Sequence, residues 1–181
     1  MTLLKTSQIL PVAAMSLFLF MLGVSPLSAQ QASVLKGHDT TQTLDVSADA
    51  IKLKQKKGQA FLSGTVKVTQ GNLVLTADQI VVLYDMAEGF DNPSVQRLDA
   101  TGGVKLTSPS ETVTSEWAVY DVEKRIVTLG GVVAYDSKDA SIKGDRLELN
   151  LRTGLVKLDG QTQDGEQRVK GRFSVPKPKE K

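Results

Sequence analysis

The chain has 181 residues, of which 40% are hydrophobic and 23% are charged, enough for one domain with a substantial core. It has no cysteine, which excludes disulfides, thiolate nucleophiles and thiolate metal sites. The formal net charge is only +2 and aromatic residues make up 5%. Nucleic acid is therefore not expected as a partner, because its recognition needs a basic surface and stacking side chains.

The N-terminus has the pattern of a targeting segment, residues 1–29. Lys5 supplies a positive start, residues 9–24 are mostly apolar, and Pro26 and Ala29 mark a cleavage region. The apolar stretch is short for a membrane-spanning helix, which needs about 20 residues. We therefore expect a cleaved signal peptide. An uncleaved membrane anchor stays open as the alternative, and both place the remainder outside the cytoplasm.

From residue 40 onward, apolar residues alternate with polar ones. Residues 147–151 show this most clearly, with leucine at every second position and polar residues between. Such alternation is typical of β-strands with one buried face, because successive side chains point to opposite sides. Glycine, asparagine, aspartate and serine separate these segments, and no helical periodicity is present. The sequence therefore predicts an all-β protein.

Four acidic residues open four similar strands at intervals of 29, 38 and 29 residues: Asp49, Asp78, Glu116 and Asp145. In each unit, the residues two and four positions after the acidic residue are expected on the buried face. Periods of 20–50 residues are typical of stacked repeats. We therefore predict four stacked repeats that form two packed sheets with a continuous apolar lane between them. The longer second interval places an inserted surface loop within residues 85–97.

A glycine falls on the inward side of a strand at the same phase of each unit: Gly64, Gly102, Gly131 and Gly160. Glycine inside a strand marks a bulge or a bend. We therefore expect all the strands to bend at one level. The acidic residues are assigned to strand-opening turns or bulges, because a calcium-binding ladder would need a glycine-rich nonapeptide that the sequence lacks.

Two segments, "FLSGTVKVTQGNLVLTADQIVV" (residues 61–82) and "SIKGDRLELN" (residues 141–150), resemble the OstA-like domain of periplasmic lipopolysaccharide-transport proteins. The resemblance extends over residues 40–169. It implies an open antiparallel β-jellyroll, placed here at residues 30–172 and followed by a disordered basic tail, residues 173–181. The interior of such a domain holds the acyl chains of lipid A.

The resemblance also implies a function and partners. It indicates a periplasmic bridge protein, without catalysis or a cofactor, that carries lipopolysaccharide from the inner-membrane exporter to the outer-membrane translocon. An open sheet leaves an unpaired strand at each edge, which can pair with another chain. The first strand, near residues 40–46, is expected to receive the inner-membrane partner. The last, near residues 155–169, is expected to meet the outer-membrane partner or a further copy, head to tail.

The predicted lipid-binding residues are those on the inward side of the strands. Keeping a dozen-carbon acyl chain in water costs about 0.8 kcal/mol per CH₂. A lane of aliphatic side chains would shield the chain from water and remove this cost. For each residue taken alone an ordinary core position is the better explanation, and the lipid-binding prediction applies to the set. The set comprises Thr40, Leu44, Val46, Ile51, Leu53, Val66, Val68, Ile80, Val82, Tyr84, Val104, Leu106, Tyr120, Val122, Val133, Leu147 and Leu149.

Some features are assigned to the solvated surface or left open. His38, the only histidine, is expected in a solvated loop, and the lysines of residues 52–57 on an outer face, with a second role near glycolipid phosphates. Trp117 packs between the sheets or lies at a rim. Two alternatives to the bridge remain: a membrane-anchored component of the same system, which would retain residues 9–24, and a self-assembling β-scaffold that carries no lipid.

Overall fold

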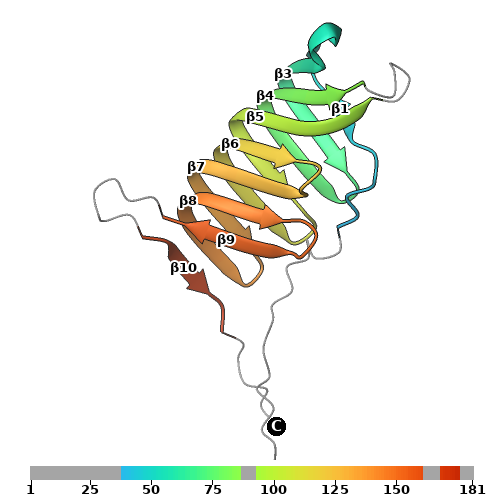
Figure 1. The fold of residues 1–181 in the computed structure, drawn as a ribbon. Coiled ribbons are helices and arrows are strands. Elements are labelled where there is room, and N and C mark those ends of the chain that lie inside the picture. The colour runs from blue at the N-terminus through green and yellow to red at the C-terminus, as the bar shows by residue number, and fades with distance from the viewer. Residues whose placement is uncertain (1–37, 87–92, 161–167, 176–181) are drawn as a thin grey trace, which may run out of the picture. The chain divides into compact units, whose positions relative to one another are not determined.

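The computed structural model describes residues 38–86, 93–160 and 168–175. In these residues the secondary structure is nearly all β, in one antiparallel sheet with a short 3-10 helix at one corner (Figure 1). The predicted signal peptide, residues 1–29, lies outside the described residues. So does most of the predicted tail, residues 176–181.

Ten strands make up the described part of the sheet, and the alternating pattern of the sequence is what forms them. Their order along the chain is β1 (Asp45–Ser47), β2 (Ala50–Lys54), η1 (Gln55–Lys57), β3 (Gln59–Gln70), β4 (Leu73–Asp85), β5 (Ser94–Thr107), β6 (Glu111–Asp121), β7 (Ile126–Ser137), β8 (Ala140–Asn150), β9 (Leu155–Asp159) and β10 (Lys170–Phe173). The last strand, β10, ends at Phe173, and the predicted domain boundary before residue 173 stays a prediction.

The six long strands, β3 to β8, pair in chain order as an antiparallel meander. Two short strands cover each free edge: β1 and β2 pair with β3, while β9 and β10 pair with β8. Among the described residues, no pairing joins the β1–β2 edge to the β9–β10 edge. The sheet is therefore open, as the sequence predicted, and both edges keep backbone groups available for pairing.

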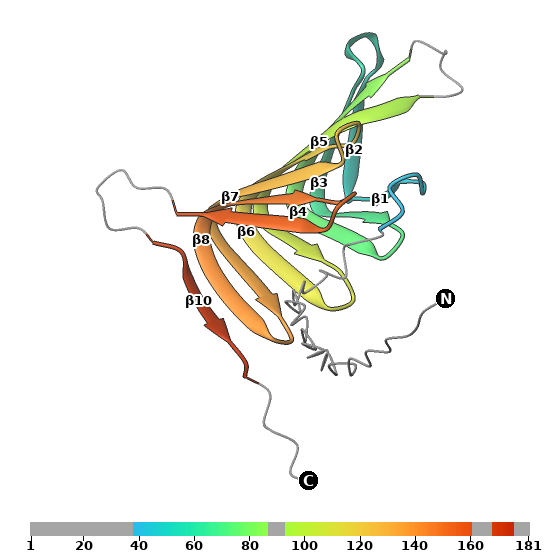
Figure 2. The ribbon, with the colours of Figure 1, turned by 60° about the horizontal axis from the view of Figure 1, so that its bottom comes forward.

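Each long strand bends near its middle. The pairing register shifts at one common level between all neighbouring long strands, for example between Ser63 and Val66 in β3 and between Gly130 and Val133 in β7. These β-bulges fold the sheet into two leaves, which Figure 2 shows diverging from the bend. The first leaf consists of β2, one half of each long strand, and β9. The second leaf consists of β1, the other half of each long strand, and β10.

Glycine is needed at this bend because of both backbone conformation and space. Gly102 has φ +79°, and a Cβ there would overlap the side chain of Asp78 on the neighbouring strand. Gly64 and Gly131 repeat this arrangement beneath two other acidic side chains, which matches the predicted bulge role. The prediction for Gly160 is wrong, since it follows the last residue of β9 and lies in no strand.

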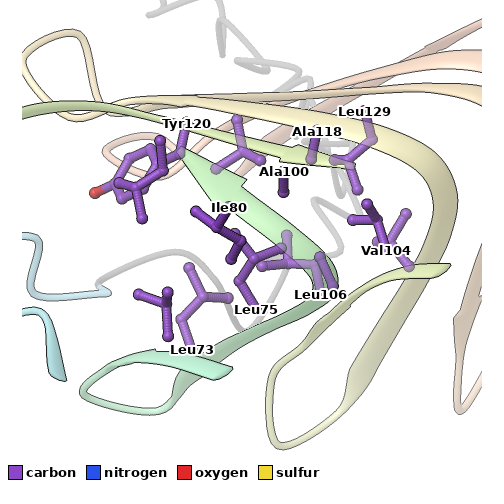
Figure 3. Close-up of a cluster of buried hydrophobic side chains, with 14 of the residues drawn as sticks. Leu73, Leu75, Ile80, Ala100, Val104, Leu106, Ala118, Tyr120 and Leu129 are labelled. Atoms are coloured by element: carbon purple, nitrogen blue, oxygen red, sulfur yellow. The ribbon is translucent and has the colours of Figure 1, made fainter. Parts of the chain in front are cut away.

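Between the leaves lies an apolar core (Figure 3). Because paired residues in neighbouring strands point to the same face, the core side chains form rows across the sheet. One row in the first leaf consists of Leu62, Ile80, Ala100, Ala118, Leu129 and Leu147, and all of them are buried. A parallel row consists of Ala60, Val82, Leu98, Tyr120, Val127 and Leu149.

Candidate functional site

The two core rows of the first leaf continue beyond the core to both edges of the sheet. At one edge, Ile51 of β2 pairs with Leu62, and this isoleucine is 53% exposed. At the other edge, Leu158 of β9 pairs with Leu147 and is half-buried. We call this edge-to-edge set, the two rows with Ile51 and Leu53 at one end and Val156 and Leu158 at the other, the inner lane. It is an apolar strip that the chain itself covers only in its middle.

At the β9–β10 edge the leaves leave a large hollow, the C-terminal groove. Its volume is about 800 Å³. A protein cavity of about 150 Å³ can hold benzene, so the groove has room for a larger apolar group. Its lining comes from β6 to β10 and the adjoining turns, and includes Glu111, Tyr135, Ala140, Ile142, Leu155, Val156, Leu158, Val169 and Phe173.

The middle of the lane is closed. A cavity beside Leu44, Val68 and Tyr120 has a volume of about 20 Å³, which is space for roughly one water molecule. The leaves are therefore in direct contact at their centre and separate toward β9 and β10. An apolar guest can enter the described structure without rearrangement at the C-terminal groove.

One polar pair lines the C-terminal groove. The Tyr135 hydroxyl donates a 2.8 Å hydrogen bond to Oε1 of Glu111, and both residues are buried. Burial, together with the adjacent Glu111 carboxyl, raises the pKa of Tyr135 to about 12. The phenol therefore stays protonated, and its hydrogen bond stays intact, throughout the physiological pH range.

A second polar cluster lies beside the closed middle of the lane. Gln70, at the end of β3, is buried, and its Oε1 accepts a 3.0 Å hydrogen bond from the Tyr120 hydroxyl. Burial raises the pKa of Tyr120. His38 Nε2 lies 3.2 Å from the same oxygen of Gln70. The prediction that His38 is a solvated loop residue is therefore wrong, because its ring is half-buried against this cluster.

The predicted lipid-binding residues all have inward or edge positions, with different burial. Ten are buried between the leaves: Val66, Val68, Ile80, Val82, Val104, Leu106, Tyr120, Val133, Leu147 and Leu149. Four are half-buried: Thr40, Leu44, Tyr84 and Val122. Val46, Ile51 and Leu53 are exposed, because β1 and β2 form the edge of the sheet and no further strand covers them. Contact of any of these residues with lipid stays a prediction.

None of the predicted lipid-binding residues lines the C-terminal groove. The missed residues include Ile142, Val156 and Leu158. Val156 and Leu158 alternate along β9 on the side that pairs with Leu149 and Leu147, so their strand parity could have identified them. Ile142 has the opposite parity from Leu147 and faces inward because β8 bends between the two residues. Phe173 was missed because the sequence prediction assigned it to the tail, residues 173–181.

Trp117 lies on the outer face of β6, so the expectation that it packs between the sheets or lies at a rim is wrong. Its ring covers Gly130, its partner across β6 and β7, and it is 38% exposed. The lysines of β2 are exposed as well, and Lys54 Nζ lies 4.3 Å from the ring centroid of Phe61 on that outer face. Across the described ranges, no helix has the length and apolar character to cross a membrane.

Comparison with known proteins identifies the family. The family model described as "LptA/(LptD N-terminal domain) LPS transport protein" matches residues 45–155, from β1 to the start of β9. The chain belongs to this family. The resemblance seen in the sequence is thus confirmed, and the matched region of this LptA/LptD N-terminal family contains the bend and most of the inner lane.

Individual relatives of the LptA/LptD N-terminal family are distant in sequence. An uncharacterized protein of Rhizobium meliloti (strain 1021) is 27% identical over 123 residues, 65% of this chain and 66% of the relative. The lipopolysaccharide export system protein LptA of Escherichia coli (strain K12) is 27% identical over 116 residues, 60% of each chain. The match thus spans about two thirds or less of these relatives.

The fold also matches a solved structure. The crystal structure of LptH, the LptA-homologous periplasmic component of the lipopolysaccharide transport device of Pseudomonas aeruginosa, superposes with a TM-score of 0.65. The match covers 76% of this chain and 99% of that one, at 18% identity. It confirms the predicted open antiparallel β-jellyroll, whereas the division into four repeats stays a prediction.

Proposed function

We propose that this protein is a periplasmic lipopolysaccharide-transport bridge whose inner lane shields the acyl chains of lipid A. The names of its relatives, an export system protein and a periplasmic transport component, support this role. The observation that carries the proposal is the inner lane itself. It runs through every long strand, from Ile51 to Leu158, and is uncovered at both ends.

The energetics of an acyl chain in water favour such a lane. A chain of a dozen carbons costs on the order of 10 kcal/mol to keep in water, at about 0.8 kcal/mol per CH₂. Rows of leucine, valine and isoleucine offer similar contacts at every step, so no single position would trap the cargo. The C-terminal groove supplies the space for a first chain, and separation of the leaves would extend that space along the lane.

The two edges are the proposed docking sites for the rest of the transport machinery. We assign the β1–β2 edge to the inner-membrane complex, and the β9–β10 edge to the outer-membrane translocon or to a second copy. Each edge has exposed apolar residues beside its free backbone groups, such as Ile51 at one and Phe173 at the other. Strand addition at both edges would continue the inner lane from one molecule to the next.

The role that we propose is transport without catalysis or a cofactor. It requires export from the cytoplasm, which the predicted signal peptide would provide, with the mature chain starting near Gln30. Intact mass measurement of the protein isolated from the periplasm tests this point. A retained N-terminus would instead support the membrane-anchored alternative.

Photocrosslinking in cells tests the lipid contact. A photoreactive residue at Leu158, on the lane, should give a lipopolysaccharide adduct, whereas one at the adjacent Lys157 should not, because Lys157 points to the outer face of β9. The two positions are adjacent in the same strand, so the two variants should meet lipopolysaccharide in the cell equally often and differ only in the face that carries the photoreactive residue. Absence of an adduct at Leu158, with assembly of the protein intact, would favour the scaffold without lipid.

A further inference from the structure

The segment of residues 38–44, which precedes the family match, lies against the end of β3, beside the small cavity in the middle of the lane. We call it the N-terminal strap. The Gln70 side chain holds it by donating from Nε2 to the backbone oxygens of Thr40 and Gln42, each at 3.0 Å. Gln70 is 3% exposed and also accepts from Tyr120, so both ends of its amide are in use.

The strap also fills the apolar space beside Gln70. Leu44 packs against the core and lines the small central cavity together with Val68, Leu98 and Val127. The start of the strap is a local turn, in which Asp39 Oδ1 accepts from the backbone N–H and the hydroxyl of Thr41. Residues 41–43 are exposed. The strap can therefore open locally while the sheet stays folded.

The groups that the strap offers to the sheet are two carbonyl oxygens and one aliphatic chain. An acyl ester or acyl amide offers the same combination, a carbonyl oxygen beside a hydrocarbon chain. If the strap leaves, Gln70 presents two buried N–H donors next to the apolar space that Leu44 filled. A bare alkyl chain would leave these donors without acceptors, whereas an acyl carbonyl would restore a partner.

We propose that the N-terminal strap occupies a binding site for the carbonyl group and first carbons of an acyl chain, and that such a ligand binds at Gln70 by displacing the strap. This inference rests on the proposed function and adds to it a ligand chemistry and a closed state of the space beside Gln70. The strap competes with the ligand, so the apparent affinity falls in proportion to the fraction of open molecules.

Calorimetric titration of the mature protein with two detergents below their micelle concentrations tests the proposal. N-dodecanoyl-N-methylglucamide has an acyl carbonyl, and n-dodecyl maltoside has the same chain length without one. Leu44→Ser weakens the strap but keeps Gln70, and should tighten glucamide binding about three- to tenfold, since more molecules are open. Val132→Ser, an equivalent change at an exposed outer-face residue, should leave the affinity unchanged. Amide hydrogen exchange should rise at residues 40–44 in Leu44→Ser and stay slow in β4 to β7.

Gln70→Leu tests the carbonyl recognition separately. In this variant the strap is also released, but the preference for the glucamide over the maltoside should disappear. A preference that survives Gln70→Leu, or a Leu44→Ser variant with faster exchange in the strap and wild-type affinity, overturns the inference. If either result is found while the photoreactive residue at Leu158 still gives the lipopolysaccharide adduct, the proposed function is not affected. Absence of detergent binding in all variants, together with the loss of that adduct, means that the proposed function has failed.

Discussion

Tyr135 shows how a single polar side chain is accommodated in an apolar groove. Its ring belongs to the inner face of the second leaf, and its hydroxyl reaches the buried carboxyl of Glu111. The hydrogen bond compensates for the removal of both groups from water. Gln70 and Tyr120 do the same beside the middle of the lane. In each of these two pairs, the buried polar groups are thus hydrogen-bonded to each other.

The raised pKa of Tyr135 predicts a loss of stability at high pH. The folded chain holds this proton more tightly than the unfolded chain, in which the pKa is 10.0, while in the folded chain it is about 12. The contribution is therefore complete below pH 10 and is lost as the pH rises toward 12. The two values correspond to about 2–3 kcal/mol. Urea unfolding at pH 9 and pH 12 should show a smaller pH-dependent loss for Tyr135→Phe than for the wild type by roughly this amount. Equal losses in the two proteins would contradict the assignment.

At the scale of the strands, the bend is the element on which the architecture depends. Each long strand contributes one half to each leaf, so a sheet that stayed flat could not bury its apolar side. The register shifts and positive-φ glycines place the bends at one level. Because the bulges repeat at that level, the apolar side chains of all the strands face the same interior.

Two adjacent glycines allow a matched test of this bend. Gly102→Ala should destabilise the fold by about 2 kcal/mol or more, because φ is +79° and the new Cβ would overlap Asp78. Gly103→Ala has φ +53°, and its Cβ would make only an ordinary van der Waals contact with Asp78 at 3.8 Å, so its cost should be about 1 kcal/mol. Urea unfolding monitored by circular dichroism gives both values. Similar losses in the two variants would show that the close contact with Asp78 does not matter.

The strands and their inward faces could be predicted because alternation and turn residues are local signals. The alternation that selected Leu147 and Leu149 as inward residues holds in the structure. The repeated spacing of the acidic residues and glycines correctly predicted three of the bends. Burial could not be predicted, because it depends on which strands form the edges. Ile51 and Leu53 have inward parity but are exposed for this reason. The groove and the contact of Gln70 with the strap involve segments far apart in the chain, which no local pattern encodes.

At the scale of the whole molecule, the open ends of the inner lane predict self-association. A second copy that adds its β9–β10 edge to the β1–β2 edge would cover Ile51 and Leu53 and extend the rows. Such a head-to-tail contact does not close, so the oligomer should grow with concentration. This expectation depends on the proposed function, because only an uninterrupted lane requires that arrangement.

Ile51→Asp should weaken this association without unfolding the chain. Ile51 is already 53% exposed, so the stability of the monomer should change by less than about 0.5 kcal/mol. Light scattering over a concentration series should show oligomers for the wild type and mainly monomers for the variant. Val132→Asp is the matched control, since Val132 is 70% exposed on the outer face of β7. Equal effects of the two variants would place the contact elsewhere.

The central claim is that the two faces of the folded sheet differ in their use, with lipid touching only the inner one. Methyl NMR spectra of the mature protein, with labelled isoleucine, leucine and valine, test it directly during titration with lipid A in detergent-free dispersion. We expect the signals of Ile51, Val156 and Leu158 on the inner lane to shift or broaden, while that of Val132 on the outer face stays unchanged. Perturbation of Val132 with unchanged lane signals would contradict the account.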